Sequence, residues 1–107
     1  METETVTIDG EHMLNHRMAH EHLAEQLAFP DYYGKNLDAL YDLLTERAGP
    51  TRLVVRHKET ILSWLGDYGE ALCQTLEDAE RVNPRLEVVY SDLEEVPPAA
   101  EESTEEN

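Results

Sequence analysis

The sequence has a single cysteine, one tryptophan and one phenylalanine, and only 8 lysines and arginines against 24 aspartates and glutamates. One cysteine, Cys73, excludes an internal disulfide, and the nearby Glu70 and Glu77 disfavour the thiolate that a catalytic cysteine needs. The formal net charge of −16 argues against nucleic acid and against anionic membrane surfaces as partners, because both are bound through cationic side chains. The charge instead favours a cationic partner.

Long apolar runs are also absent. No segment approaches the ~20 apolar residues that a helix needs to cross a bilayer. The first ten residues, METETVTIDG, lack the basic and apolar regions of a signal peptide. Together with the lone cysteine, these features predict a reduced, cytoplasmic setting. Solubility alone would be a sufficient reason for the acidity, and this explanation stays open.

The acidity is spread along the chain of 107 residues, which has room for one domain. Six glutamates lie within the last 14 residues, yet the remainder still carries a net charge of −10. From residue 91 onward the sequence is polar, acidic and proline-containing, with too little apolar surface to order itself. We therefore predict one folded domain over residues 1–90, followed by an acidic disordered tail over residues 91–107.

Hydrophobic periodicity predicts three strands and four helices. The expected strands cover residues 3–8, 51–57 and 86–90, and the expected helices cover residues 12–28, 37–47, 60–65 and 70–82. The second strand, TRLVVRH, has a nearly unbroken apolar centre, which is typical of burial on both faces. Pairs of helices between successive strands imply parallel crossovers, and therefore an α/β fold with a small sheet packed against helices.

Histidines recur at His12, His16 and His20, with His22 close by. Two histidines four residues apart on a helix can share a metal ion, but the sequence has no HExxH pattern and no cysteine cluster. These rings would equally suit the edge of a core. We predict no cofactor and no metal site, and keep a zinc-binding domain built on the histidines as an alternative.

The segment FPDYYGKNLDALYDLLT places Asp38 and Asp42 one helical turn apart, where like charges repel by about 0.2–0.5 kcal/mol. Asp38 follows the expected N-cap Asn36 and gains from the helix dipole, whereas Asp42 lies too far along the helix to do so. Two carboxylates on one face of one helix share an environment, which does not suit acid–base catalysis. An enzyme is not expected, and the face instead suggests a surface completed by a cationic partner.

The same segment resembles the signature of the barstar family of intracellular ribonuclease inhibitors. The shared pattern is a proline, an acid, Tyr-Tyr-Gly, any residue, Asn-Leu-Asp-Ala-Leu, an aromatic residue, Asp and Leu-Thr, and IDGE at residues 8–11 fits the family's first strand and turn. The similarity continues to about residue 90. The resemblance implies a three-stranded parallel sheet with four helices. It also implies 1:1 inhibition of a basic secreted ribonuclease by a protein that is monomeric when free.

Carried over by position, the resemblance implies which side chains meet the ribonuclease. Asp42 matches the aspartate that enters the enzyme's phosphate-binding pocket, and Asp38 matches its companion, so that both would stand in for RNA phosphates. Tyr32 matches the tyrosine that packs against the catalytic histidine. Asp78 is the best counterpart of a further carboxylate on the last helix. The remaining predicted partner-binding residues are Tyr33, Gly34, Asn36, Tyr41 and Thr45.

Four positions depart from the family pattern. Tyr41 replaces a tryptophan that is often found there, and Glu46 and Arg47 replace a glycine and an aromatic residue that known binders can carry. Lys35 lies within the binding loop, and Arg47 is expected to place a positive charge beside a cationic target. These departures leave an alternative open, in which the acidic face binds another cationic protein or toxin without inhibiting a ribonuclease.

Overall fold

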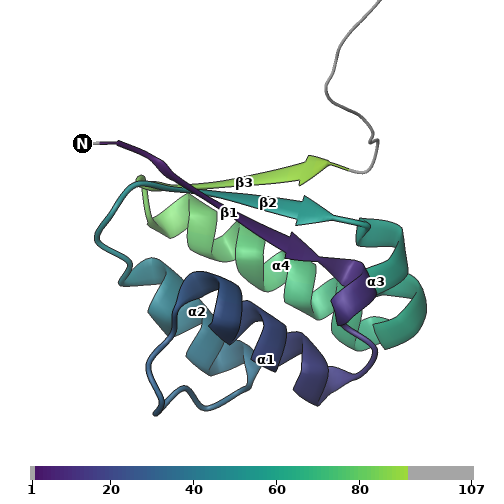
Figure 1. Cartoon of the computed structure of the whole chain (residues 1–107). Coiled ribbons are helices and arrows are strands. Elements are labelled where there is room, and N and C mark those ends of the chain that lie inside the picture. Colours follow the sequence, from purple (N-terminus) through teal and green to yellow (C-terminus); the bar gives the residue numbers. More distant parts are fainter. Residues whose placement is uncertain (1, 92–107) are drawn as a thin grey trace, which may run out of the picture.

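Three parallel strands form one sheet in the order β1-β2-β3, and the α-helices lie on one side of it (Figure 1). The computed structural model describes residues 2–91, so the predicted tail lies outside the described residues except for Ser91, which ends the last strand. The three-stranded parallel α/β fold with four α-helices is confirmed. The elements are β1 (Glu4–Asp9), the 3₁₀ helix η1 (Gly10–His12), α1 (His16–Leu27), α2 (Leu37–Thr45), β2 (Thr51–Arg56), α3 (Lys58–Leu65), α4 (Asp67–Val82) and β3 (Leu86–Ser91).

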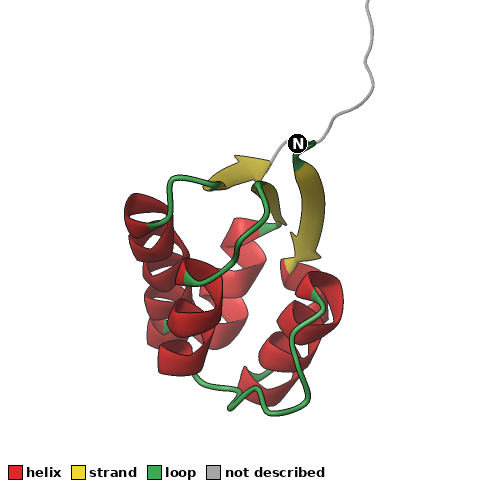
Figure 2. Ribbon diagram, turned by 90° about the vertical axis from the view of Figure 1, so that its left-hand side faces the viewer, coloured by secondary structure: helices red, strands yellow, loops and turns green. Residues whose placement is uncertain are grey.

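The central strand β2 is covered on one face only. Leu53 and Val55 are fully buried, whereas Arg52 and Arg56 are exposed and Val54 is partly exposed. The prediction that this strand is buried on both faces is wrong. The physical reason is visible in Figure 2, where the helices lie on one side of the sheet and no helix of residues 2–91 covers its other face.

The first predicted helix is divided in two. Asn15 Oδ1 accepts a hydrogen bond from the Met18 N–H at 2.9 Å, which makes Asn15 the N-cap and starts α1 at His16. Gly10 begins the separate η1, and only glycine fits there because a Cβ would lie 2.3 Å from the His57 carbonyl oxygen. Three residues of irregular chain, 13–15, therefore separate η1 from α1.

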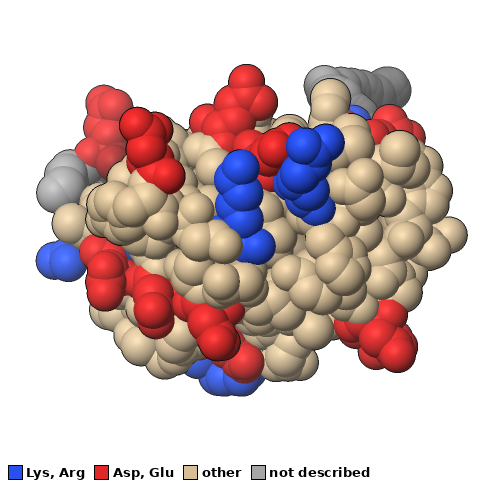
Figure 3. Space-filling model, turned by 90° about the horizontal axis from the view of Figure 1, so that it is seen from below, with Lys and Arg blue, Asp and Glu red and all other residues tan. Residues whose placement is uncertain are grey.

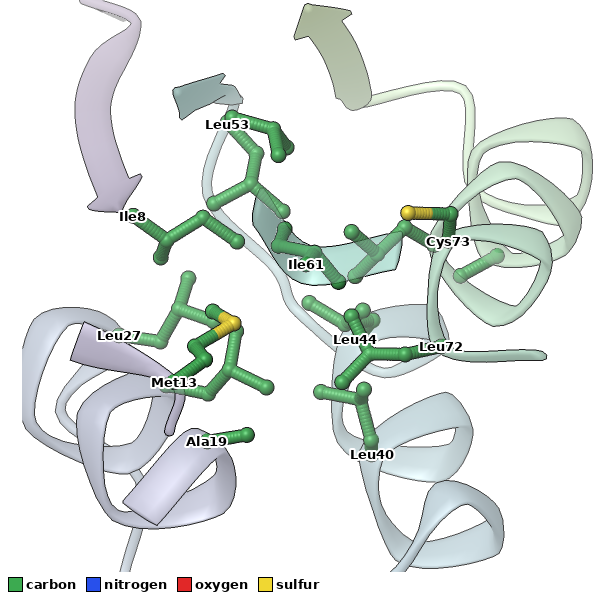
Figure 4. Packing of buried hydrophobic residues seen from close by; sticks show 14 of the residues in the cluster. Ile8, Met13, Ala19, Leu27, Leu40, Leu44, Leu53, Ile61, Leu72 and Cys73 are labelled. Carbon is green, nitrogen blue, oxygen red and sulfur yellow. The ribbon is translucent and has the colours of Figure 1, made fainter. Parts of the chain in front are cut away.

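The core lies between the sheet and the helices. Figure 4 shows side chains from strands and helices converging there, and each such side chain contributes about 1.5–3 kcal/mol when fully buried. Helix α2 contributes Leu40 and Leu44, which are both fully buried and pack in the same cluster as Leu72 of α4. This packing fixes which side of α2 faces the core and which side is left at the surface.

A histidine–carboxylate pair joins the carboxyl ends of β1 and β2. His57 Nδ1 lies 2.7 Å from Asp9 Oδ1, and its Nε2 lies 3.7 Å from Glu11 Oε2. The hydrogen bond with Asp9 raises the pKa of His57 above its ordinary value. Burial acts to raise the pKa of Asp9, but hydrogen bonds from the Glu11 N–H and from His57 outweigh it, so that this pKa is lowered. His57 adopts a left-handed backbone conformation with a φ of 58°.

We expect His57→Asn to destabilise the protein in a pH-dependent way. A raised folded-state pKa means that the contribution of His57 is complete below its ordinary value of 6.5 and is lost as the pH rises through the raised value. Asparagine tolerates the left-handed conformation, so backbone strain is not the main effect. Urea unfolding should show a wider stability gap between wild type and variant near pH 5.5 than near pH 9. A gap that stays constant over this range would contradict the charged pair.

Candidate protein-interaction site on α2

The start of α2 is tied to the loop that precedes it. Asn36 Oδ1 accepts a hydrogen bond from the Ala39 N–H at 2.8 Å, as its predicted N-cap role requires, and its Nδ2 donates to the Gly34 carbonyl at 3.3 Å. Lys35 has a φ of 57°, so the chain turns sharply just before the cap. One side chain therefore positions both the helix and the Tyr32–Tyr33–Gly34 segment.

Three carboxylates follow one another at intervals of four residues along α2 and its C-terminal end. Asp38, Asp42 and Glu46 are all exposed, on the side of the helix that Leu40 and Leu44 leave free. Within residues 2–91, none of these three carboxylates makes a hydrogen bond or an ion pair with another side chain. Figure 3 shows a row of acidic side chains along one border of the face seen from below. We call Asp38, Asp42 and Glu46 the α2 carboxylate row.

Arg47 is turned away from this row. Its Nη1 donates to the Leu27 carbonyl at 3.0 Å, its Nε donates to Thr51 Oγ1 at 2.8 Å, and its Nη2 lies 3.1 Å from Glu4 Oε1. Only 19% of its side chain is exposed. The expectation that Arg47 presents a positive charge to a target is therefore wrong, because the end of α1 and the strands β1 and β2 take up its guanidinium.

Lys35 is also engaged elsewhere. Its Nζ lies 3.7 Å from Glu21 Oε2 on α1, and both side chains are about half exposed. Among residues 2–91, the lysine and arginine ion pairs involve other carboxylates, and none involves Asp38, Asp42 or Glu46. The α2 carboxylate row is thus left without a compensating cation among the described residues.

A hollow of about 290 Å³ opens beside the row. Tyr32 stands on its rim with 81% of its surface exposed, whereas Tyr33 is only 7% exposed and forms part of its wall. A hollow that combines aromatic and apolar walls with two carboxylates suits a cationic side chain of a partner. The residues that line it are Tyr32, Tyr33, Gly34, Ala39, Asp42, Leu43 and Glu46.

The other predicted partner-binding residues do not line the hollow. Tyr41 is half-buried against the core, and Thr45 Oγ1 donates to the Asp42 carbonyl at 3.0 Å. Asp78 lies on α4, which packs against α2, but its carboxylate already pairs with Arg81 and accepts a hydrogen bond from Gln74 at 2.9 Å. Glu46 is the residue of the row that the sequence analysis does not predict, although its spacing of four from Asp42 indicates the same face of α2.

Packing accounts for the histidine series. The rings of His12 and His22 stack with their centroids 4.8 Å apart, and His16 stacks on Tyr68 at 3.7 Å. Both ring nitrogens of His20 lie within hydrogen-bond distance of tyrosine hydroxyls. With both of its nitrogens engaged, His20 has no free ligand atom to share with His16 for a metal ion.

A different group has the residue types that a metal ion needs. Asp9, Glu11 and His57 bring their ligand atoms within 4.8 Å of one another. However, the 2.7 Å contact between Asp9 and His57 is a hydrogen bond that already uses one atom from each of these side chains. The group is adequately explained by the ion pair described above, and no cofactor is assigned to it.

The fold and the α2 face define a small α/β protein whose α2 carboxylates lie at the surface without a compensating cation among the described residues. Residues 3–102 match the protein family described as Barstar (barnase inhibitor), and the chain belongs to this family. Over 76 residues it is 38% identical to a Bacillus subtilis (strain 168) protein named "Putative ribonuclease inhibitor YrdF", which covers 70% of this chain and 84% of that protein. Both findings support ribonuclease inhibition as the general function. Among the helices described, none is sufficiently long and apolar to cross a membrane.

We expect Arg47→Ala to lower the free energy of unfolding by about 1–3 kcal/mol, because it removes hydrogen bonds from a charged donor and leaves the Leu27 carbonyl without a partner. Lys35→Ala is the matched control, since it removes an equal charge from an exposed ion pair and should change the free energy by less than about 1 kcal/mol. Denaturant unfolding of both variants checks this. Equal changes in the free energy of unfolding in the two variants would mean that the hydrogen bonds of Arg47 do not stabilise the fold.

Proposed function

We propose that the protein inhibits a basic secreted ribonuclease by covering its active site with α2, so that Asp38 and Asp42 take the places of RNA phosphates. The observation that supports this most directly is the α2 carboxylate row, which no cation of residues 2–91 compensates. A ribonuclease presents cationic side chains to its substrate. Carboxylates on a helix can pair with the same groups while the body of the helix excludes water.

The energies favour this arrangement. Charge-assisted hydrogen bonds that lose water on binding are strong, and truncating one partner costs about 2–5 kcal/mol at measured interfaces, the barnase–barstar pair among them. Repulsion between Asp38 and Asp42 costs only about 0.2–0.5 kcal/mol in the free protein. The buried side chains of Leu40 and Leu44 fix α2 against the core, so α2 loses little conformational entropy when the protein binds its partner.

The tyrosines and the overall charge would assist the same event. Tyr32, the most exposed large apolar side chain among residues 2–91, can pack flat against a partner next to the hollow, as tyrosines at binding hot spots do. The net charge of −16 accelerates the approach of a basic enzyme. We propose a 1:1 complex, formed inside the producing cell by a protein that is monomeric when free.

A second candidate function retains the site but changes the target. Glu46 adds a third carboxylate where relatives in the family can carry glycine, and it borders the hollow next to Asp42. A partner that matches all three carboxylates needs more positive charge at this end of α2 than one that matches two. A cationic protein or toxin other than a ribonuclease could supply this positive charge. In that case the protein would bind its partner without inhibiting RNA cleavage by any ribonuclease.

A titration separates the two candidates. Barnase, and then the basic ribonucleases secreted by the source organism, are mixed with increasing amounts of the protein while RNA cleavage is followed. Inhibition that saturates at one protein per enzyme supports occlusion of the active site. Binding to a cationic protein without loss of cleavage supports the second candidate, and failure to bind or inhibit any of the basic ribonucleases contradicts the first.

Asp42→Ala should weaken binding to the inhibited ribonuclease by about 2–5 kcal/mol. The free energy of unfolding should stay equal or rise slightly, because a repulsion is relieved. Glu59→Ala on α3 removes the same charge from another exposed position and should leave the affinity nearly unchanged. Because Glu59 lies in the first turn of α3, its removal should lower the free energy of unfolding by about 0.3–1 kcal/mol. Isothermal titration calorimetry and urea unfolding provide the two measurements. A collapse of stability in Asp42→Ala would show that Asp42 has a structural role instead.

A further inference from the structure

His20 on α1 is a buried polar side chain that the proposed mechanism has not used. Only 1% of its surface is exposed. Its Nδ1 lies 2.6 Å from the hydroxyl of Tyr33, in the loop before α2, and its Nε2 lies 2.6 Å from the hydroxyl of Tyr68, on α4. One imidazole ring therefore links two helices to the segment that lines the hollow.

Burial decides the direction of the two hydrogen bonds. Tyr33 is almost fully buried, so its hydroxyl proton needs an acceptor within the protein, and His20 Nδ1 is in place to accept it. Tyr68 is only partly buried and can donate its own proton to water. The neutral ring therefore carries its proton on Nε2 and donates it to the Tyr68 oxygen, while the Tyr33 hydroxyl donates to Nδ1.

Tyr33 connects this ring to the partner site. It lies between Tyr32, which stands on the rim of the hollow, and Gly34, and all three residues line the hollow together with Asp42. The segment belongs to a loop without regular secondary structure. Asn36 holds the Gly34 carbonyl and the Tyr33 N–H donates to the Pro30 carbonyl at 3.0 Å, but the Tyr33 hydroxyl is the group of this segment that is bound to His20 on α1. Loss of this bond would loosen the Tyr33 side chain while leaving the helices and the other loop contacts in place.

We propose that Tyr68 and His20 position the Tyr32–Tyr33–Gly34 segment for partner binding, and that protonation of His20 releases this segment and weakens binding in acid. The inference rests on the proposed function, because the segment matters only if this face is the binding face. Protonation turns Nδ1 from an acceptor into a donor, so the hydrogen bond that the Tyr33 hydroxyl donates to Nδ1 is lost and the hydroxyl proton has no acceptor in the buried site. His20 is thus a positioning residue that acts through Tyr33.

The surroundings of His20 determine the pH at which the segment is released. Burial lowers the pKa of His20 below its ordinary value of 6.5, and the nearby His16 lowers it further. The titratable groups that face the ring are Tyr33 from the loop, Tyr68 from α4 and His16 from its own helix. A lowered pKa keeps the ring neutral at neutral pH, so the link is intact there and is lost only as the pH falls through the lowered value.

A first experiment needs no partner. Nitrogen-15 spectra of the His20 ring follow its protonation from pH 8 into acid, and amide hydrogen exchange of residues 32–35 is measured over the same range. We expect the neutral ring to carry its proton on Nε2, and residues 32–35 to exchange faster, relative to the α2 amides, as the ring becomes charged. Exchange that does not follow the titration of His20 would overturn the proposal, even if ribonuclease inhibition were proven.

A second experiment measures inhibition with Tyr33→Phe and Tyr68→Phe, using barnase or whichever ribonuclease the titration above identifies. Each variant keeps its ring and loses one hydroxyl. Tyr90→Phe is the matched control. The hydroxyl of Tyr90 donates to Glu77 at 2.6 Å and takes no part in the hydrogen bonds between Tyr33, His20 and Tyr68. We expect Tyr33→Phe to raise the inhibition constant by about three- to tenfold at neutral pH, the equivalent of one hydrogen bond, and Tyr68→Phe to raise it by a smaller factor.

At each pH, the inhibition constant of the variant is divided by that of the wild type. The titration of the ribonuclease itself affects both constants equally and therefore cancels in this ratio. This ratio should approach one as the pH falls through the pKa of His20, since the wild type has then lost the link as well. A ratio for Tyr33→Phe that is the same at every pH indicates a merely structural hydroxyl and overturns the acid release. A ratio of one at neutral pH overturns the positioning role.

Discussion

The proposed binding face depends on negative charge that the fold leaves uncompensated. Surface helices gain a few tenths of a kcal/mol from each opposite-charge pair at a spacing of four residues, and α2 does not use this stabilisation. Arg47 is drawn into the body, and Lys35 is paired with α1. Because buried leucines hold the helix, its carboxylates keep a fixed geometry in the free protein. A cationic partner then relieves repulsion and meets an organised surface at the same time.

Much of the fold could be predicted from the sequence, because it follows from local patterns. Alternating β-branched residues define β1, the Gly-Pro and Asn-Pro breaks separate the elements, and Asn36 is the N-cap that its position indicates. The spacing of Asp38 and Asp42 against Leu40 and Leu44 placed the two carboxylates on the exposed side of α2. These features follow from short-range sequence patterns, so they can be predicted without knowing which distant residues come into contact.

The rest could not be predicted because it depends on contacts between residues far apart in the chain. The inward turn of Arg47 requires the end of α1 and the strands β1 and β2 as partners, and the burial of His20 requires tyrosines from two other elements. An apolar strand such as β2 reads alike whether one or both of its faces are covered. The position of Glu46 is an exception, because its spacing of four residues from Asp42 already indicates that the two carboxylates share one face of α2.

The uncovered face of the sheet has a practical consequence. It carries the exposed Arg52 and Arg56 and the partly exposed Val54 of β2, whereas α2, which carries the carboxylate row, lies with the other helices on the opposite side of the sheet (Figure 1). The two surfaces are separated by the entire core. A fluorophore or a surface tether fixed to this face of the sheet would therefore leave the α2 carboxylate row free, so the molecule can be immobilised with the proposed binding face pointing outward.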